Sequence, residues 1–367
     1  MHLPRFFTDP RNLPAAARAS ARPSLKPPQA FFTALGCALA LLTTPACGKR
    51  HGSPTWNSPG DSASPAATHP AARPTTTTKR TSAGADETTS GLRFIAYNVE
   101  NWLTMDRSHD HTDAKGVSKP AAEKRAVIAL LSHHVPDVLG VCEIGSREDL
   151  AELQSALKAS GVELPHSHYT GGGDELRHLG LLSRFPITST ATPAPAELDF
   201  KLNGSAYTMC RGILDATIQA NGKSYRLLGV HLKSKREVAD GDQDAIRLCE
   251  ARVLRHHVDA ILTADTGARL IVYGDFNDTR GSAALKIITG NSGDATCLSP
   301  IPVHDRQGER WTQFWALQDI YSRFDFITVS QCLKHEVDAT TSRIIDDPEW
   351  IDASDHRALL AVFNRSP

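Results

Sequence analysis

Short apolar segments of β-strand character recur from Leu92 to the C-terminal end of the chain, and they alternate irregularly with helix-forming segments. The segment "LRFIAYNV" first alternates and then becomes fully apolar, as a central strand does. "CRGILDATIQANGKSYRLLGVHLKS" contains two strands joined by Asn221-Gly222, a typical hairpin turn. Because hairpins are frequent and strict strand–helix–strand repetition is absent, we expect an α/β fold with two packed mixed β-sheets flanked by helices.

The first 47 residues have the pattern of an export leader. An apolar run covers Ala30 to Leu42, Lys26 precedes it, and the small residues of "TTPAC" follow it. The run is too short for a comfortable transmembrane helix. We therefore expect an exported protein. It is either a cell-surface lipoprotein, attached to a membrane through a lipidated Cys47, or a secreted or periplasmic protein cleaved nearby.

Residues 48–90 form a tract rich in Pro, Ser, Thr and Ala that cannot bury apolar area, so we expect a disordered linker. The folded domain is then predicted over residues 91–367. Residues 1–90 hold 10 of the 40 basic and 4 of the 41 acidic residues, which leaves 30 basic and 37 acidic residues and a net charge near −7 in the domain. A protein that relies on non-specific duplex binding is usually basic. This domain is acidic, so binding of nucleic acid would require bound cations that offset its clustered carboxylates.

Residues able to bind a hard cation or move a proton stand at or near the ends of several predicted strands. They are Asn98, Glu143, His231, Asp275, Asn277, Asp325, Asp355 and His356. A single Asp at a strand end is more often a turn former, but neighbouring strands deliver their ends to one sheet edge, and the conjunction favours a shared site. Oxygen donors suit Mg²⁺, Mn²⁺ or Ca²⁺, and the cysteines lack the CxxC spacing of a zinc site.

The segment "IVYGDFND" shows the pattern in detail. In an extended strand Asp275 and Asn277 point to the same side, because the side-chain period is two, and Phe276 faces the opposite way into packing. Gly274 permits a close approach of the neighbouring backbone. Asp278 falls outside this alternation, and we expect a turn residue there.

The motifs "YNVEN", "CEI", "LLSRFPI", "GVHLKSKR", "YGDFND", "RFDFI" and "SDHRAL", in this order, resemble the endonuclease/exonuclease/phosphatase (DNase I-like) superfamily. Its members include nucleases, inositol polyphosphate 5-phosphatases and bacterial sphingomyelinases. The similarity covers roughly Leu92 to Asn364, and "YNVEN" with "GVHLKSKR" is similar to predicted extracellular nucleases of bacteria. The resemblance implies a four-layered α/β sandwich.

The resemblance also implies roles for single residues. Metal binding falls to Asn98, Glu143 and Asp355, and catalysis to His231, Asp275, Asn277, Asp325 and His356. In this scheme His356 is the catalytic histidine and Asp325 orients it. Two positions depart from the family pattern, because Cys142 replaces a common glutamine and His178 stands where many relatives place an acid. Which residue assists His231 is therefore open.

Three basic residues are candidates for substrate binding. Lys233 follows His231 and is either a phosphate contact or part of a solvated turn. Arg184 either faces the cleft or anchors a loop, and Arg247 is either a substrate or a structural arginine.

A phosphodiester is anionic and repels a nucleophile, so its hydrolysis calls for a divalent cation and a proton acceptor near the attacking water. The sequence therefore predicts an exported Mg²⁺- or Mn²⁺-dependent phosphodiesterase, a nuclease acting on DNA or RNA through an activated water. The alternatives are a sphingomyelinase-like phospholipase C, a phosphatase for small metabolites, or a non-catalytic binding module on the same fold. We expect a monomer, and no motif indicates a protein partner.

Overall fold

The computed structural model describes residues 91–109, 112–236 and 241–364. The predicted leader (residues 1–47), including Cys47, and the predicted linker (residues 48–90) lie outside the described residues. Among the helices that are described, none is long and apolar enough to cross a membrane.

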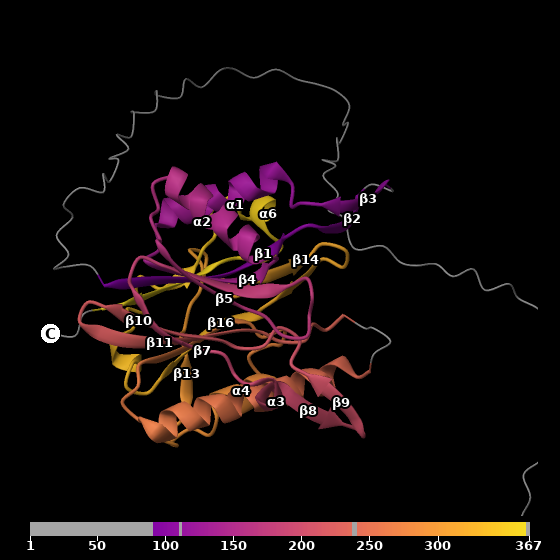
Figure 1. The fold of residues 1–367 in the computed structure, drawn as a ribbon. Coiled ribbons are helices and arrows are strands. Elements are labelled where there is room, and N and C mark those ends of the chain that lie inside the picture. Colours follow the sequence, from indigo (N-terminus) through magenta and orange to yellow (C-terminus); the bar gives the residue numbers. More distant parts are fainter. Residues whose placement is uncertain (1–90, 110–111, 237–240, 365–367) are drawn as a thin grey trace, which may run out of the picture. The chain divides into compact units, whose positions relative to one another are not determined.

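Two six-stranded mixed sheets form the centre of the folded domain (Figure 1). The first has the order β17-β18-β1-β4-β6-β5, and the second has the order β13-β16-β12-β11-β10-β7. The strands of the first sheet are β1 (Leu92–Trp102), β4 (Val138–Ile144), β5 (His166–Thr170), β6 (His178–Ser183), β17 (Arg343–Ile344) and β18 (Leu359–Phe363). Those of the second are β7 (Ile187–Ala191), β10 (Leu214–Ala220), β11 (Lys223–His231), β12 (Leu270–Asp275), β13 (Leu298–Pro300) and β16 (Asp325–Ser330).

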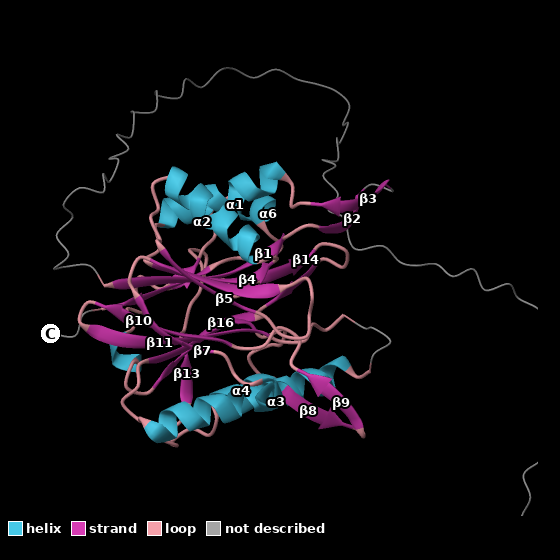
Figure 2. Cartoon of the chain, in the orientation of Figure 1, coloured by secondary structure: helices cyan, strands magenta, loops and turns pink. Residues whose placement is uncertain are grey.

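Helices cover the outer face of each sheet (Figure 2). The first sheet carries α1 (Ala121–His134), α2 (Arg147–Ala159) and α6 (Trp350–Ala353), and the second carries α3 (Pro195–Leu198), α4 (Gln243–Ala264) and α5 (Ala283–Thr289). Three small hairpins project from this body, namely β2 (Met105–His109) with β3 (Thr112–Val117), β8 (Asp199–Leu202) with β9 (Ser205–Thr208), and β14 (Gln313–Trp315) with β15 (Ile320–Ser322).

Three buried apolar clusters hold the layers together. One lies between the two sheets and includes Phe94 and Tyr273, a second joins the first sheet to its helices, and a third joins the second sheet to α4 and α5. The Tyr273 ring packs so closely on Gly140 of the facing sheet that a Cβ there would lie 2.1 Å from the ring. The predicted four-layered α/β sandwich is confirmed.

Local sequence signals specify several element boundaries. Ser146 begins α2 as its N-cap: its hydroxyl accepts from the Asp149 backbone N–H, and the Asp149 carboxylate accepts from the Ser146 backbone N–H. Such a capping box contributes on the order of 1 kcal/mol to helix stability. Asn221 and Gly222 both adopt positive φ (53° and 77°), as the predicted two-residue hairpin between β10 and β11 requires.

Candidate active site

The register of the second sheet brings three of the predicted side chains side by side. β11 runs parallel to β12 and pairs His231 with Asp275, while β16 runs antiparallel to β12 and pairs Asp275 with Asp325. His231 Nε2 lies 3.5 Å from Asp275 Oδ2. The C-terminal ends of β11 and β12 and the start of β16 therefore form one edge.

The first sheet supplies its strand ends to the same place. The Asn98 amide donates from Nδ2 to Glu143 Oε1 and to Asp275 Oδ2, both at 3.2 Å, so one side chain links the two sheets. Glu143 Oε2 accepts from the Asn101 backbone N–H at 2.9 Å. Glu143 Oε1 lies 4.0 Å from His231 Nε2.

His356 completes the cluster from the loop before β18. Its Nδ1 lies 2.7 Å from Asp325 Oδ2, and its Nε2 faces Asp275 Oδ2 at 3.7 Å. The Ser354 hydroxyl donates to the Asn98 carbonyl at 2.8 Å and accepts from the His356 backbone N–H, which fixes this loop to the end of β1. Side chains more than 250 positions apart in the sequence thus converge as predicted, while their catalytic roles remain predictions.

Backbone strain is concentrated around this cluster. Glu100, Asn101, Glu143 and Asn277 all have positive φ, at 47°, 54°, 64° and 49°. Such conformations are costly for residues with a Cβ and are often retained where they place a functional side chain. For Glu143 the strain coincides with the point at which the β4 pairing changes register.

The prediction for "GDFND" is correct in part. Gly274 allows the close approach expected of it, because a Cβ there would lie 1.9 Å from the Val230 carbonyl oxygen, and Phe276 is buried. The assumption that strand alternation carries on to Asn277 is wrong. The strand ends at Asp275, and Asn277, with its left-handed backbone, donates from Nδ2 to the Leu232 carbonyl (2.9 Å) and from its backbone N–H to Asp275 Oδ1 (2.8 Å).

Two neighbouring residues, Asp278 and Arg247, form an ion pair. Asp278 lies in the bend after β12, as expected of a turn residue, and its carboxylate also contacts Lys235 Nζ at 2.9 Å and Arg247 Nε at 3.4 Å. Arg247 is buried, 1% exposed, and its guanidinium also binds Asp244 and the Lys233 carbonyl. Of the two roles left open for Arg247, the structure supports the structural one, that of holding the segment after His231 against α4.

Of the two roles left open for Arg184, facing the cleft or anchoring a loop, the structure supports the second, because β6 runs antiparallel to β4. The start of β6 lies beside Ile144, whereas its end lies beside Val138, at the opposite edge of the sheet from Glu143. Arg184 follows that end and pairs with Asp137 at 3.0 Å.

We expect Arg184→Ala to leave turnover unchanged within about twofold and to lower the free energy of unfolding by at most about 1 kcal/mol, since the Arg184 side chain is about half exposed. Steady-state kinetics and urea unfolding of the variant check this. A loss of activity greater than tenfold with intact stability would contradict the placement.

Two further predicted residues lie at the margin of the cluster. Lys233 is half-buried, and its backbone N–H donates to Glu250 Oε2 at 2.5 Å, so its side chain stays a candidate for a substrate contact. The Asp355 backbone N–H donates to Glu100 Oε2 at 3.0 Å. The position of Asp355 directly before His356 keeps its carboxylate a candidate metal ligand.

Burial and neighbouring charge drive the pKa values of the central groups apart. Burial raises the pKa of Asp275 to about 7, and the carboxylates of Asp325 and Glu143 add to the rise. Burial lowers the pKa of His231, and Arg211 adds to this effect. Burial also acts to lower the pKa of His356, but Asp325 and the other nearby carboxylates outweigh it and raise that pKa well above its usual value. Such separated acids and bases are typical of catalytic sites.

Three residues near the cluster were not predicted from the sequence. Glu100 belongs to the quoted motif "YNVEN", so a signal for it existed. Arg177, whose Nε lies 4.0 Å from Glu143 Oε2, and Arg211, which pairs with Asp174 at 3.1 Å, stand outside strand ends and carried no such signal. In the described part of the chain, neither Asp174 nor His178 contacts His231 in the role that the sequence left open, since Asp174 pairs with Arg211 and His178 Nδ1 contacts the Gly145 carbonyl. The carboxylates of Asp275 and Glu143 lie near His231 Nε2 instead.

The donor set fits a hard divalent cation. Three carboxylates, those of Glu143, Asp275 and Asp325, gather around one point, and Asp275, Asp325 and His356 place their ligand atoms within 4.8 Å of one another. Burial, with the neighbouring carboxylates adding to it, raises the pKa of Asp275, and a bound cation would favour its ionised form. Oxygen ligands of this kind are those that Mg²⁺, Mn²⁺ and Ca²⁺ prefer.

The fold and this site together define the class of enzymes that cleave phosphoesters with a metal ion. The model of the Endonuclease/Exonuclease/phosphatase family matches residues 114–356, and the chain belongs to that family. No curated protein matches the chain.

Solved structures show the same fold. An endonuclease/exonuclease/phosphatase from Bacteroides vulgatus superposes with a TM-score of 0.52 at 16% identity, covering 76% of this chain and 100% of its own. The 3′ phosphatase NExo from Neisseria, bound to a product DNA hairpin, has a TM-score of 0.50 at 17% identity, covering 75% and 100%. Beta toxin from Staphylococcus aureus with bound magnesium ions has a TM-score of 0.50 at 16% identity, with the same coverage.

Proposed function

We propose that this protein is a metal-dependent phosphodiesterase that hydrolyses nucleic acid through an activated water. The observation that carries the proposal is that the buried Asp275 carboxylate lies between His231 and His356, at the edge where the strand ends of both sheets come together. The pKa of His356 is raised and that of His231 is lowered, so His356 can act as a proton donor while His231 acts as a neutral hydrogen-bonding group.

The chain's own groups supply the proton transfers. The Nε2 of His356 faces the site, and Asp325 holds the ring through Nδ1, so this pair exchanges a proton with the water or with the leaving oxygen. Asp275 is the alternative acceptor for the proton of the water. His231 and Arg211 are positioned to stabilise negative charge on the non-bridging oxygens, since Arg211 Nη1 is buried and has no hydrogen-bond partner among the described residues.

We propose Asn98, Glu143 and Asp355 as the residues that hold a Mg²⁺ ion, with Mn²⁺ or Ca²⁺ as substitutes. The bound ion would neutralise charge on the phosphate and make a coordinated water more acidic. The magnesium ions in the structurally similar beta toxin support this proposal.

Nucleic acid is the preferred substrate class for two reasons. The motifs "YNVEN" and "GVHLKSKR" are similar to those of predicted extracellular nucleases, and the Neisseria 3′ phosphatase of the same fold binds a DNA hairpin. Export by the predicted leader would suit digestion of environmental DNA. The leader itself stays a prediction.

The test is a panel of substrates assayed with the domain purified over residues 91–367. We expect nucleotide release from plasmid DNA or RNA in Mg²⁺ or Mn²⁺, and a loss of at least about 10³-fold on chelation, restored by added metal. A bis-aryl phosphodiester and a phosphomonoester complete the panel. An enzyme that ignores nucleic acid yet cleaves another member of the panel would remove the nuclease assignment while keeping phosphoester hydrolysis.

One observation favours a second candidate, a phospholipid phosphodiesterase. The hairpin of β14 and β15 exposes Trp315, Leu317, Ile320 and Tyr321 and joins the site through the backbone bridge between Gln313 and His356. Sphingomyelin vesicles therefore belong in the panel, and release of phosphocholine faster than of nucleotides would favour this candidate.

A further inference from the structure

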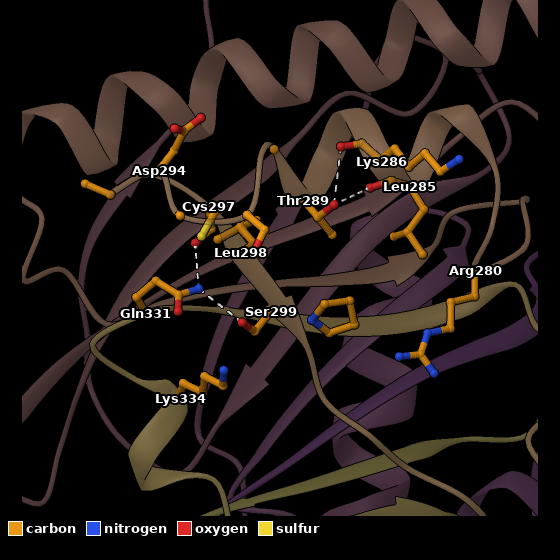
Figure 3. Close-up of a pocket in the computed structure, with 15 residues that line it drawn as sticks. Arg280, Leu285, Lys286, Thr289, Asp294, Cys297, Leu298, Ser299, Gln331 and Lys334 are labelled. Carbon is orange, nitrogen blue, oxygen red and sulfur yellow. Dashed lines mark hydrogen bonds between the residues drawn. The ribbon is translucent and has the colours of Figure 1, made fainter.

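A basic groove lies along the free edge of the second sheet, outside the cluster described above. It consists of two cavities that share Arg280 and Pro300, one of about 450 Å³ and one of about 170 Å³. Its cationic residues, taken together, are Arg280, Lys286, Arg310, Arg323 and Lys334. Figure 3 shows the larger cavity, with Arg280 on one side, Lys334 and Gln331 on the other, and Ser299 between them.

Most of these cations have no carboxylate partner. Among the residues that the structure describes, Arg280, Lys286, Arg310 and Lys334 are exposed and take part in no recorded ion pair. The acidic residue that lines the groove, Asp294, accepts a hydrogen bond from Asn291 at 3.1 Å. The folded domain carries a net charge near −7, so a concave strip of unpaired positive charge is unexpected unless it serves an anionic ligand.

The smaller cavity has the strongest concentration of charge. Arg323 is held over the Phe326 ring and donates to the Val303 carbonyl at 3.1 Å. Burial lowers its pKa to about 10 although the Asp325 carboxylate opposes the decrease, and the positive charges of Arg280 and Arg310 add to it. A phosphate oxygen bound here would relieve this repulsion and contribute charge-assisted hydrogen bonds.

The groove leads away from the reacting groups. Arg323 stands two residues before Asp325, at the site end of β16, whereas Gln331 and Lys334 follow the opposite end of that strand. The strand between these two ends has six residues and is about 17 Å long at the usual rise per residue. That length corresponds to roughly five nucleotides of one strand of B-form DNA.

The larger cavity also has a defined floor. Gln331 donates from Nε2 to the Cys297 carbonyl at 3.1 Å and to Ser299 Oγ at 3.0 Å, which ties the loop after α5 to the end of β16 (Figure 3). Arg280 and Lys334 lie on opposite sides of this floor and Lys286 lies on α5 at its rim, so the three cations can contact successive phosphates of one strand (Figure 3).

We propose that the basic groove binds the phosphate backbone of a nucleic-acid strand whose scissile phosphate lies at Asp275. This inference rests on the proposed nuclease function and adds to it a binding track of several nucleotides on one side of the cleavage point. Since most of the groove extends away from the reacting groups, its contacts there bind substrate and transition state alike and act on KM rather than on kcat.

The test compares the wild-type domain with the triple variant Arg280→Ala, Lys286→Ala, Lys334→Ala. The substrates are an oligonucleotide of about 20 nucleotides, one of about 4 nucleotides, and a bis-aryl phosphodiester. For the long oligonucleotide we expect a higher KM and a slope of log KM against log salt that is smaller by about 2. Over a fourfold rise in salt this means that the wild type loses about 16-fold more affinity than the variant does. Turnover of the aryl phosphodiester stays unchanged.

A matched control removes three exposed cations elsewhere, through Arg125→Ala, Lys158→Ala and Lys201→Ala, with the same change in net charge. If this control shifts the KM and the salt slope as far as the groove variant does, the effect is one of overall charge and the groove proposal is overturned. An unchanged KM of the groove variant on the long substrate would also overturn it, with the nuclease function intact. A wild-type domain that is inert on both oligonucleotides but active on the aryl phosphodiester would instead refute the proposed nuclease function itself.

Discussion

Replacing Asp275 with asparagine should abolish turnover and at the same time stabilise the metal-free protein. We expect kcat to fall by at least about 10³-fold, because the carboxylate faces His231 and His356 and accepts from Asn98 at the centre of the site. Asparagine has the same shape, so the loss would come from charge. Steady-state kinetics with saturating Mg²⁺ measure this part of the prediction.

The stability gain follows from the raised pKa of Asp275. Its folded-state pKa lies above the unfolded value of 3.8, so the ionised carboxylate destabilises the folded state. This penalty is absent below pH 4, grows as the pH rises towards 7, and is complete above that. Urea unfolding with chelator should therefore show an advantage of Asp275→Asn that is larger at pH 8 than at pH 5, and exceeds about 1 kcal/mol at pH 8.

Asp215→Asn is the matched control, since Asp215 is an equally buried carboxylate on β10 of the same sheet. It pairs with Arg226 at 2.6 Å and His257 at 2.8 Å, and these partners lower its pKa although burial opposes them. Its removal should cost about 3–5 kcal/mol of stability with turnover retained in the folded fraction. If both variants lost stability and activity together, Asp275 would be a structural residue.

The second large effect is expected at the Asp325–His356 pair. His356→Ala should lower kcat by about 10²–10⁴-fold, because it removes the group that exchanges the proton. Asp325→Asn should lower the pKa of His356, because the Asp325 carboxylate is the largest influence that raises it, and the limb of the kcat–pH profile that reports His356 should move to lower pH. The double variant should be no worse than His356→Ala alone, since residues that act as a unit are not additive.

His134→Ala serves as control for this pair, because His134 is also buried and its Nε2 also binds an aspartate, Asp347, at 2.8 Å. It lies at the end of α1, outside the active-site cluster, and its loss should affect stability only. Full additivity of the Asp325 and His356 substitutions, or a pH profile that does not move, would show that the two side chains act independently.

The sequence was sufficient for the fold and for most of the site because both depend on short-range patterns. Strand periodicity predicts which face is buried, and the side chain that follows a strand is carried to the sheet edge. Asn98, Glu143, His231 and Asp275 were found in this way, and the structure brings them together.

The errors arise where strand direction or backbone conformation decides the outcome. Arg184 was a candidate for the site, with loop anchoring as the alternative, because it follows an apolar strand, but β6 runs antiparallel to β4 and ends at the far edge. Asn277 was assigned an extended backbone, whereas its φ of 49° turns the chain away. Arg211 precedes a strand instead of following one, so the expectation that side chains after strands gather at a sheet edge does not identify it.

The contact of Tyr273 with Gly140 has a consequence for the chemistry. Because the amide of Asn98 joins carboxylates from both sheets, the separation of the sheets is also the separation of the reacting groups. An aromatic ring resting on a residue without a side chain acts as the spacer that fixes this separation. The geometry of the candidate site is thus set in part by a packing contact inside the apolar core.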